Sequence, residues 1–193
     1  SAAYIQAVRT NLPGAVTVFD HFHIVKLLNE KLSELRRQLY REATDQLQKQ
    51  VLKGTRWLLL KRPERLDEKR REHERLLEAL KLNESLAIAY YLKEDLRQLW
   101  EQPDQQSAAA VMDDWIAAAD SSGIRVLRSF ARTLAIHRRG ILAWYDYPIS
   151  TGTLEGTNNK IKTMQRQAYG FRDQQFLKLK ILALHRTRYA LVG

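Results

Sequence analysis

Apolar side chains recur at every third or fourth position along one long stretch of this chain, and this spacing constrains the fold more than any other feature. Residues three and four apart lie on the same face of a helix, which has 3.6 residues per turn. The spacing therefore predicts one long amphipathic helix that ends at Gly54. The apolar positions are Ile24, Leu28, Leu32, Leu35, Leu39, Ala43, Leu47 and Val51.

The composition agrees with a helical protein that has its own core. Hydrophobic residues make up 45% of the 193 residues, whereas eight glycines and four prolines are few for a turn-rich β fold. We expect a mainly α fold with one clear strand, Ala15–Phe19, because this short run is apolar and β-branched. Residues 140–147 suit a strand or a helix. Further helices are expected at residues 4–8, 67–82, 83–100, 105–120, 124–137, 154–169 and 174–189.

Several of these helices have recognisable ends. Asn83 and Asp104 are expected N-caps, because their side chains can accept hydrogen bonds from the first N–H groups of a helix. Thr153 is expected to cap the helix that Gly170 ends, and Asp173 to start the last one. The charged helix at 67–82 is expected to bury Leu76, Leu77 and Leu80.

Composition also limits the possible functions. The chain has no cysteine, which excludes disulfides and thiolate metal sites and fits a reducing cytoplasm. We find no signal peptide and no run of 18 apolar residues, and therefore expect no membrane partner and a cytoplasmic, nucleoid-associated protein.

The net charge of +10 is unevenly distributed. Residues 36–75 carry a net charge of +6 and residues 155–189 another +6, whereas residues 76–123 carry −6. The two basic zones are candidate surfaces for nucleic acid. The alternative is a set of ordinary solvated helix faces.

Residues 150–172 combine one acid with a series of basic and amide side chains. Asn159, Lys162 and Arg166 follow Glu155 by four, seven and eleven residues, so on a helix all four lie on one face. A carboxylate beside this series suits a metal ion together with a phosphate backbone. The alternative is a solvated face with an acid favoured by the helix dipole.

Four blocks of the sequence resemble one known family. The block around Glu155 resembles the segment with the last acid of DDE-type insertion-sequence transposases of the ISL-three group. Residues 16–29, VTVFDHFHIVKLLN, resemble the strand end with the group's second catalytic aspartate, here Asp20, and the Phe-His-Ile/Val-x-Lys signature that follows it. Two less specific blocks, residues 56–61 and 89–94, resemble parts of the helical segment between these acids.

This resemblance implies a fold, an activity and partners. It implies an RNase H-like core that brings Asp20 and Glu155 together across 135 positions: residues 1–25 and 139–193 belong to the core, and residues 26–138 form a helical insertion. It implies an enzyme that cuts DNA and joins its 3′-ends to target DNA by transesterification, with two Mg²⁺ or Mn²⁺ ions. The implied partners are double-stranded DNA, as transposon ends and target, and further copies of the full-length enzyme. The expected DNA contacts are Asn159, Lys160, Lys162, Arg166 and Arg172.

One departure limits the expected activity. A DDE site needs three acids, and the first aspartate of the family lies upstream of the block around Asp20, where this chain has 19 residues without Asp or Glu. We therefore expect a C-terminal portion of a transposase that is inactive alone. The rival hypotheses are a non-catalytic helical DNA-binding module and a helical scaffold or dimerisation piece built on the helix at 24–52.

Other candidate residues have less support. His21 and His23 alternate if the strand continues past Asp20, but no third zinc ligand is near in the sequence, so a zinc site is disfavoured. For His23 we expect instead that it orients a group near the acid or stacks in the core. The pair Asp113-Asp114 is interpreted as solvated, and Asp146 as a turn residue. The four tryptophans fit core packing better than base stacking. Trp144 and Tyr145, which lie close in sequence to Glu155, are the first candidates for an exception.

Overall fold

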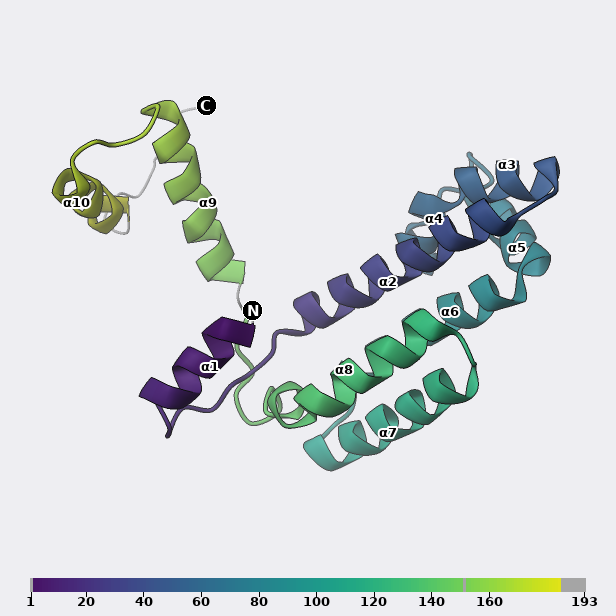
Figure 1. Cartoon of the computed structure of the whole chain (residues 1–193), viewed down its shortest axis with the longest axis horizontal. Coiled ribbons are helices and arrows are strands. Elements are labelled where there is room, and N and C mark those ends of the chain that lie inside the picture. The colour runs from purple at the N-terminus through teal and green to yellow at the C-terminus, as the bar shows by residue number, and fades with distance from the viewer. Residues whose placement is uncertain (1, 151, 185–193) are drawn as a thin grey trace. The chain divides into compact units, whose positions relative to one another are not determined.

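The computed structural model describes residues 2–150 and 152–184, in two compact units, Ser1–Ile149 and Ser150–Gly193, each of which is described by itself (Figure 1). The described residues are mainly helical, as predicted. The first unit contains α1 (Ala2–Asn11), α2 (His21–Glu42), α3 (Gln46–Gly54), α4 (Arg56–Leu60), the 3-10 helix η1 (Pro63–Arg65), α5 (Glu72–Leu82), α6 (Glu84–Asp95), the 3-10 helix η2 (Leu96–Trp100), α7 (Gln105–Ser121) and α8 (Arg125–Leu142). The second unit contains α9 (Gly152–Gln167) and α10 (Gln174–Leu184).

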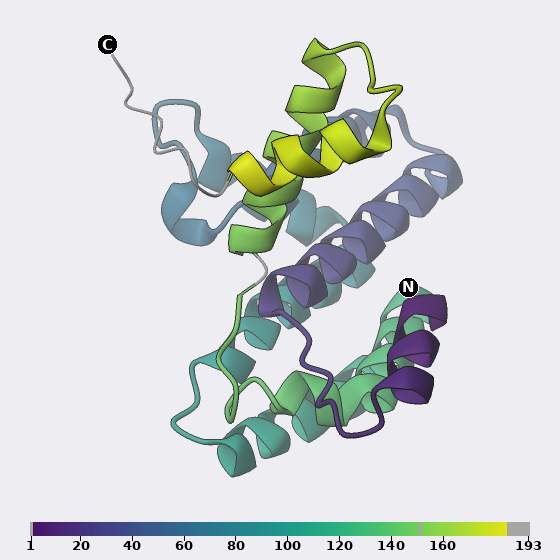
Figure 2. The same ribbon diagram turned by 90° about the vertical axis from the view of Figure 1, so that its left-hand side faces the viewer.

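The core of the first unit lies where α2 packs against α6 and α8. Helix α7 runs along α8, as the two views in Figures 1 and 2 show. Burying an aliphatic or aromatic side chain contributes about 1.5–3 kcal/mol, so this centre supplies much of the stability of the unit. Side chains that are almost completely buried there include Leu28, Leu86, Met112, Leu127 and Phe130.

The predicted strand at Ala15–Phe19 is wrong. The segment is an irregular connection between α1 and α2, and no strand occurs within residues 2–150 or 152–184. A strand requires a second strand as its hydrogen-bonding partner, whereas the backbone N–H of Phe19 donates to the carbonyl oxygen of Gly140 in α8 at 2.9 Å.

The single helix predicted from Ile24 to Gly54 is two helices. Helix α2 ends at Glu42, and Asp45 begins α3 as its N-cap by accepting hydrogen bonds from the backbone N–H groups of Leu47 at 3.2 Å and Gln48 at 3.4 Å. The helices pack against each other, and both bury leucines in the same core. The apolar spacing therefore continues from α2 into α3, so the spacing alone does not indicate where the first helix ends.

Most of the other predicted helix ends are confirmed. Asn83 accepts a hydrogen bond from the N–H of Leu86 at 2.9 Å, and Asp104 accepts one from Ser107 at 2.7 Å, as N-caps of α6 and α7. In the second unit, Gly170 follows the end of α9 with a φ of 97°, a conformation that favours glycine.

Three details of the prediction are corrected. Helix α5 begins at Glu72, five residues later than expected, and Leu77 is 37% exposed, whereas Leu76 and Leu80 are buried. Helix α8 continues to Leu142, so the undecided stretch 140–147 is a helix end followed by turns. Helix α9 already includes Gly152, which places Thr153 inside the first turn instead of at the cap.

The structure divides into its two compact units between residues 149 and 150. The division at residues 25 and 138, into core segments and a helical insertion, stays a prediction. Within the part of the chain that the structure describes, no helix is both long enough and apolar enough to cross a membrane.

Candidate functional site

Asp20 is held at the start of α2. Its backbone is extended, with φ −64° and ψ 130°, and its Oδ1 accepts a hydrogen bond from the backbone N–H of Phe22 at 2.8 Å. The side chain of Asp20 is 3% exposed, and Nδ1 of His21 lies 3.4 Å from the same oxygen. The first turn of α2 therefore fixes the orientation of this carboxylate, although no strand leads to it.

A close contact with α8 positions the segment before Asp20. A Cβ atom added at Gly140 would lie 2.6 Å from two atoms of the Phe19 ring and 2.9 Å from the carbonyl oxygen of Thr17. The ring of Phe19 also packs against that of His137, with centroids 4.9 Å apart. The missing side chain at residue 140 thus lets the segment cross α8 at short range immediately before Asp20.

The polar series on α9 has the predicted helical form. Glu155 is half-buried in the first turn, where the helix dipole favours a negative charge. The five predicted DNA contacts are all solvent-exposed, four of them on the helix and the fifth beyond it: Asn159, Lys160, Lys162, Arg166 and Arg172. Asn159, Lys162 and Arg166 follow Glu155 along one face of α9, whereas Lys160, two residues from Lys162, points to another side of the helix.

The two candidate metal ligands belong to different units. Asp20 lies in Ser1–Ile149 and Glu155 in Ser150–Gly193, so their shared site stays a prediction. Within residues 2–150 and 152–184, no group of three or more His, Asp or Glu side chains is arranged to hold a metal ion. Both residues are carboxylates, the ligand type that Mg²⁺ and Mn²⁺ prefer.

The histidines after Asp20 lie on a helix and not on a continuing strand. His21 and His23 occupy the first turn of α2, two residues apart, and therefore point to different sides of it. The ring of His21 lies 5.8 Å from that of Trp100 and 6.2 Å from that of Trp144. His23, for which the sequence favoured a packing or orienting role, is exposed and therefore not part of the core, and an orienting role for it stays a prediction.

Two of the other acids weighed from the sequence, Asp113 and Asp146, have structural partners. Asp113 is exposed, and its carboxylate accepts hydrogen bonds from both terminal nitrogens of Arg138. This ion pair joins α7 to α8. Asp146 lies in a turn, as predicted, and accepts a hydrogen bond from Nε2 of Gln105 at 3.2 Å.

The tryptophans do not all pack in the core, and the prediction is wrong for Trp57. Trp115 is buried, and its indole N–H donates to the carbonyl oxygen of Leu92 at 2.7 Å. Trp100 and Trp144 are half-buried. Trp57, however, is 65% exposed on α4, with the guanidinium carbon of Arg56 4.7 Å from its ring centroid. This exposed ring is a surface feature that the apolar run around it concealed.

A buried lysine was missed altogether. The side chain of Lys93 is completely buried, and its ammonium group donates to the carbonyl oxygens of Leu59 at 2.7 Å and Lys61 at 3.2 Å. Glu94 pairs with it at 2.5 Å, and burial lowers the pKa of Lys93 while this carboxylate acts in the opposite direction. Its spacing of three residues from Tyr90 and seven from Leu86, both buried, was the available signal.

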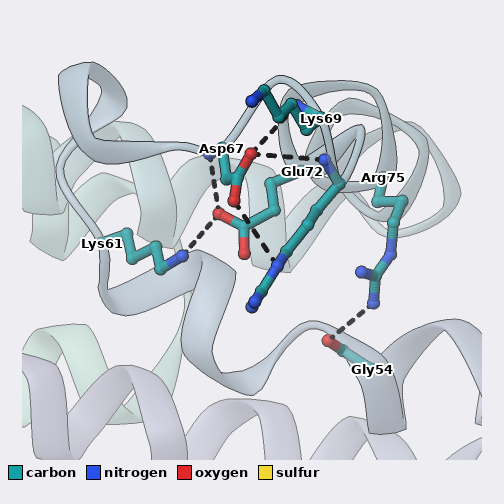
Figure 3. A network of polar contacts seen from close by, with 7 residues as sticks. Gly54, Lys61, Asp67, Lys69, Glu72 and Arg75 are labelled. Carbon is teal, nitrogen blue, oxygen red and sulfur yellow. Dashed lines mark hydrogen bonds and ion pairs between the residues drawn. The ribbon is translucent and has the colours of Figure 1, made fainter.

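A second polar network, which involves the side chain of Lys61, connects the end of α4 to α5 (Figure 3). Glu72 is 6% exposed and accepts hydrogen bonds from Nζ of Lys61 at 2.5 Å and from the backbone N–H of Asp67 at 2.9 Å. The hydrogen bond from Lys61 is the main cause that lowers the pKa of Glu72. Residues 56–61 are thus held through the backbone by Lys93 and through a side chain by Glu72.

Comparison with known proteins places these residues in a family. A transposase family model of the DDE type and the ISL-three group matches residues 1–181. The chain is 35% identical over 185 residues to the transposase for insertion sequence element IS1001 of Bordetella parapertussis. The aligned region covers 95% of this chain and 45% of that transposase. The chain is 32% identical over 209 residues to the transposase for IS1557 of Mycobacterium tuberculosis, covering 96% of this chain and 46% of the relative.

The chain therefore spans less than half the length of the curated relatives that it matches. No solved structure matches it. The family match includes both acid-containing blocks, around Asp20 and around Glu155, and the helical segment between them. The chain belongs to the ISL-three group of DDE-type transposases.

Proposed function

We propose that this chain is the C-terminal part of a transposase that cuts DNA and joins the 3′-ends to target DNA by metal-dependent transesterification. The observation that carries this proposal is the family match over residues 1–181, which includes Asp20 and Glu155. In this proposal the two residues are the second and third acids of the catalytic site, within an RNase H-like core. The three-part division at residues 25 and 138 belongs to the same proposal.

The donor atoms suit the metal that this chemistry uses. Asp20 and Glu155 offer hard carboxylate oxygens, and the N–H of Phe22 holds the Asp20 carboxylate in place. Bound Mg²⁺ or Mn²⁺ activates an attacking oxygen and stabilises a leaving oxygen at phosphorus. The role of this chain is to supply two of the three acids that hold the ions. Because two carboxylates bind such a pair of ions poorly, we propose that the isolated chain does not cleave DNA.

The exposed cations on α9 and directly after it are proposed to bind the DNA backbone. Lys160, Lys162 and Arg166 on the helix and Arg172 after it are exposed cations, and Asn159 adds an amide that can donate to a phosphate oxygen. Contacts of this kind position a duplex without reading its sequence. The substrate is proposed to be double-stranded DNA of the transposon ends and the target, bound by more than one copy of the complete enzyme at the bacterial nucleoid.

A second candidate function is a helical DNA-binding module without catalysis. One specific observation favours it: Asp20 has a structural role as the N-cap of α2, which explains its burial without a metal ion. The two proposals differ in what Glu155→Gln does to the complete transposase. The amide keeps the shape of the side chain but loses the charge that a metal ion needs.

The test is a cleavage and strand-joining assay of the complete transposase with Mg²⁺, using its own transposon ends. The catalytic proposal predicts that Glu155→Gln and Asp20→Asn abolish both steps, while each variant still binds duplex DNA. The matched control is Asp113→Asn, which changes an exposed acid in an ion pair on α7. Activity of Glu155→Gln within about tenfold of wild type would remove Glu155 from the catalytic site and favour the module.

A further inference from the structure

A basic groove of about 400 Å³ lies between α2 and α4 in the first unit. We call it the α2–α4 groove. Four of its lining side chains are basic, and Glu30 is its single acidic lining residue. Since DNA phosphates are recognised by arginine and lysine side chains, the charge of this groove fits an anionic strand. The basic lining residues are Lys26, Arg36 and Arg37 of α2 and Arg56 of α4.

The positive charges in the groove are concentrated around Arg36. Its Nη1 donates to the carbonyl oxygen of Leu52 at 2.9 Å, which fixes the guanidinium group, while its buried Nε has no hydrogen-bond partner in the described part of the chain. Burial, followed by the nearby charges of Arg56 and Arg37, lowers the pKa of Arg36. An anion that enters the groove would relieve this repulsion, which gives phosphate a favourable place to bind.

An exposed aromatic ring lies next to this charge. Arg56 lines the groove, and its guanidinium group also stacks over the ring of Trp57, with 4.7 Å from its carbon atom to the ring centroid. The indole of Trp57 is 65% exposed. Proteins that bind single-stranded nucleic acids combine a basic groove with exposed aromatic rings, because the bases stack on the rings while the phosphate backbone follows the basic side chains.

We propose that the α2–α4 groove binds a DNA strand with an unpaired base, whose phosphates contact Arg37 and Arg56 and whose base stacks on Trp57. A base inside an intact duplex is already stacked on its neighbours and cannot use the ring. The inference rests on the proposed function in that it takes DNA as the ligand. In this inference the first unit binds unpaired DNA, and the cations on α9 bind duplex DNA.

The test measures binding of the 193-residue chain to a labelled oligo(dT) strand and to a blunt duplex of the same length, by fluorescence anisotropy. Trp57→Ala is expected to weaken oligo(dT) binding by about 5- to 100-fold, the usual range for the loss of one stacked base, and to leave duplex binding within about twofold. Trp57→Phe is expected to restore most of the affinity, because an aromatic ring can still stack. Tyr91→Ala is the matched control, since Tyr91 is 55% exposed and does not line the groove.

A second set of variants tests the charge. Arg37→Ala and Arg56→Ala are expected to lower the affinity for oligo(dT) and to flatten its dependence on salt. Arg128→Ala removes an exposed arginine from α8, outside the groove, and is expected to leave the salt slope unchanged. Oligo(dT) should also quench tryptophan fluorescence in the wild type and much less in Trp57→Phe.

Two results would overturn the inference: equal oligo(dT) affinity of the wild type and Trp57→Ala, or an equal loss of oligo(dT) and duplex binding in that variant. The first removes the stacking contact, and the second shows a surface that does not distinguish unpaired from paired DNA. Failure of the proposed function is a different outcome. It appears as duplex binding that does not respond to changes on α9, or as cleavage that survives the loss of Glu155.

Discussion

The ammonium group of Lys93 lies 2.7 Å from the carbonyl oxygen of Leu59, 34 residues earlier in the chain. This contact joins α6 to the end of α4, and the second acceptor, the carbonyl oxygen of Lys61, follows at 3.2 Å. The two blocks that resemble the helical segment of the family, residues 56–61 and 89–94, are therefore in direct contact. A charged side chain in the core is tolerated here because carbonyl oxygens and a carboxylate surround it.

Replacing Lys93 by methionine should destabilise the first unit by about 2–4 kcal/mol, because the buried carbonyl oxygens of Leu59 and Lys61 lose their donor. Methionine retains the apolar length of the side chain, so the effect isolates the charge. Urea unfolding followed by circular dichroism measures the change. Lys81→Met, at an exposed position at the end of α5, is the control and should stay within about 0.5 kcal/mol of wild type. An equal effect of both variants would contradict the structural role of Lys93.

Tyr90, whose ring lies under the Lys93 ammonium group at 4.7 Å, should make stability depend on pH in the alkaline range. Burial raises the pKa of Tyr90 from 10.0 to about 12. Between these values the unfolded chain loses the phenol proton while the folded chain keeps it. The stability present below pH 10 is therefore lost as the pH rises through this window, by at most about 3 kcal/mol.

Tyr90→Phe should lose less stability between about pH 9 and about pH 11 than the wild type does, because it has no phenol to titrate. Urea unfolding at the two pH values measures this difference. Tyr91→Phe, which changes an exposed phenol next to it, should behave like the wild type. If Tyr90→Phe and the wild type lose the same stability, the buried phenol does not account for the effect.

The contact between Phe19 and α8 should not tolerate a side chain at residue 140. Gly140→Ala places a methyl group 2.6 Å from the Phe19 ring, which must move, and this overpacking should lower the free energy of unfolding by about 1–3 kcal/mol. In the complete transposase the same variant should lower cleavage, because Phe19 precedes Asp20. Gly14→Ala meets no atom of the described residues within 4 Å and serves as the control in thermal unfolding. A Gly140→Ala protein as stable as this control would show that the segment moves without cost.

The exposed cations on α9 and directly after it should carry salt-sensitive binding to duplex DNA. Changing Lys160, Lys162, Arg166 and Arg172 together to alanine should lower the affinity and flatten the plot of log affinity against log salt. The control is the double change of Arg128 and Arg132 to alanine; both are exposed on α8, outside the basic zones 36–75 and 155–189. An unchanged slope in the α9 variant would mean that these four cations form only a solvated face.

How far the sequence predicted this structure depends on what decides each feature. Local hydrogen bonding decides helix ends, so Asn83, Asp104 and Asp173 could be placed from their residue types. Asp45 caps α3 in the same way. The apolar spacing continues past it, however, because α2 and α3 bury leucines in the same core, and the spacing therefore predicts one helix instead of two. Local hydrophobicity suggested a strand at residues 15–19, whereas a strand depends on a partner that the described residues do not provide.

The candidate site divides in the same manner. Helical periodicity was enough to place Glu155 and the basic residues of α9 on one helix. The exposure of Trp57 and the burial of Lys93 depend on which face of α4 and α6 meets the core, and this follows from tertiary packing. The α2–α4 groove likewise combines Arg56 with cations more than 18 residues earlier in the chain, so no local pattern reveals it.

The most direct test of the central claim, that Asp20 and Glu155 hold the same metal ions, is a double-mutant cycle on Mn²⁺ affinity in the complete transposase, measured by electron paramagnetic resonance. A shared site predicts that Asp20→Asn and Glu155→Gln each weaken Mn²⁺ binding, and that the double variant binds Mn²⁺ little worse than the weaker single variant. Unchanged Mn²⁺ affinity in either single variant, or losses that add in full as for independent sites, would contradict the account.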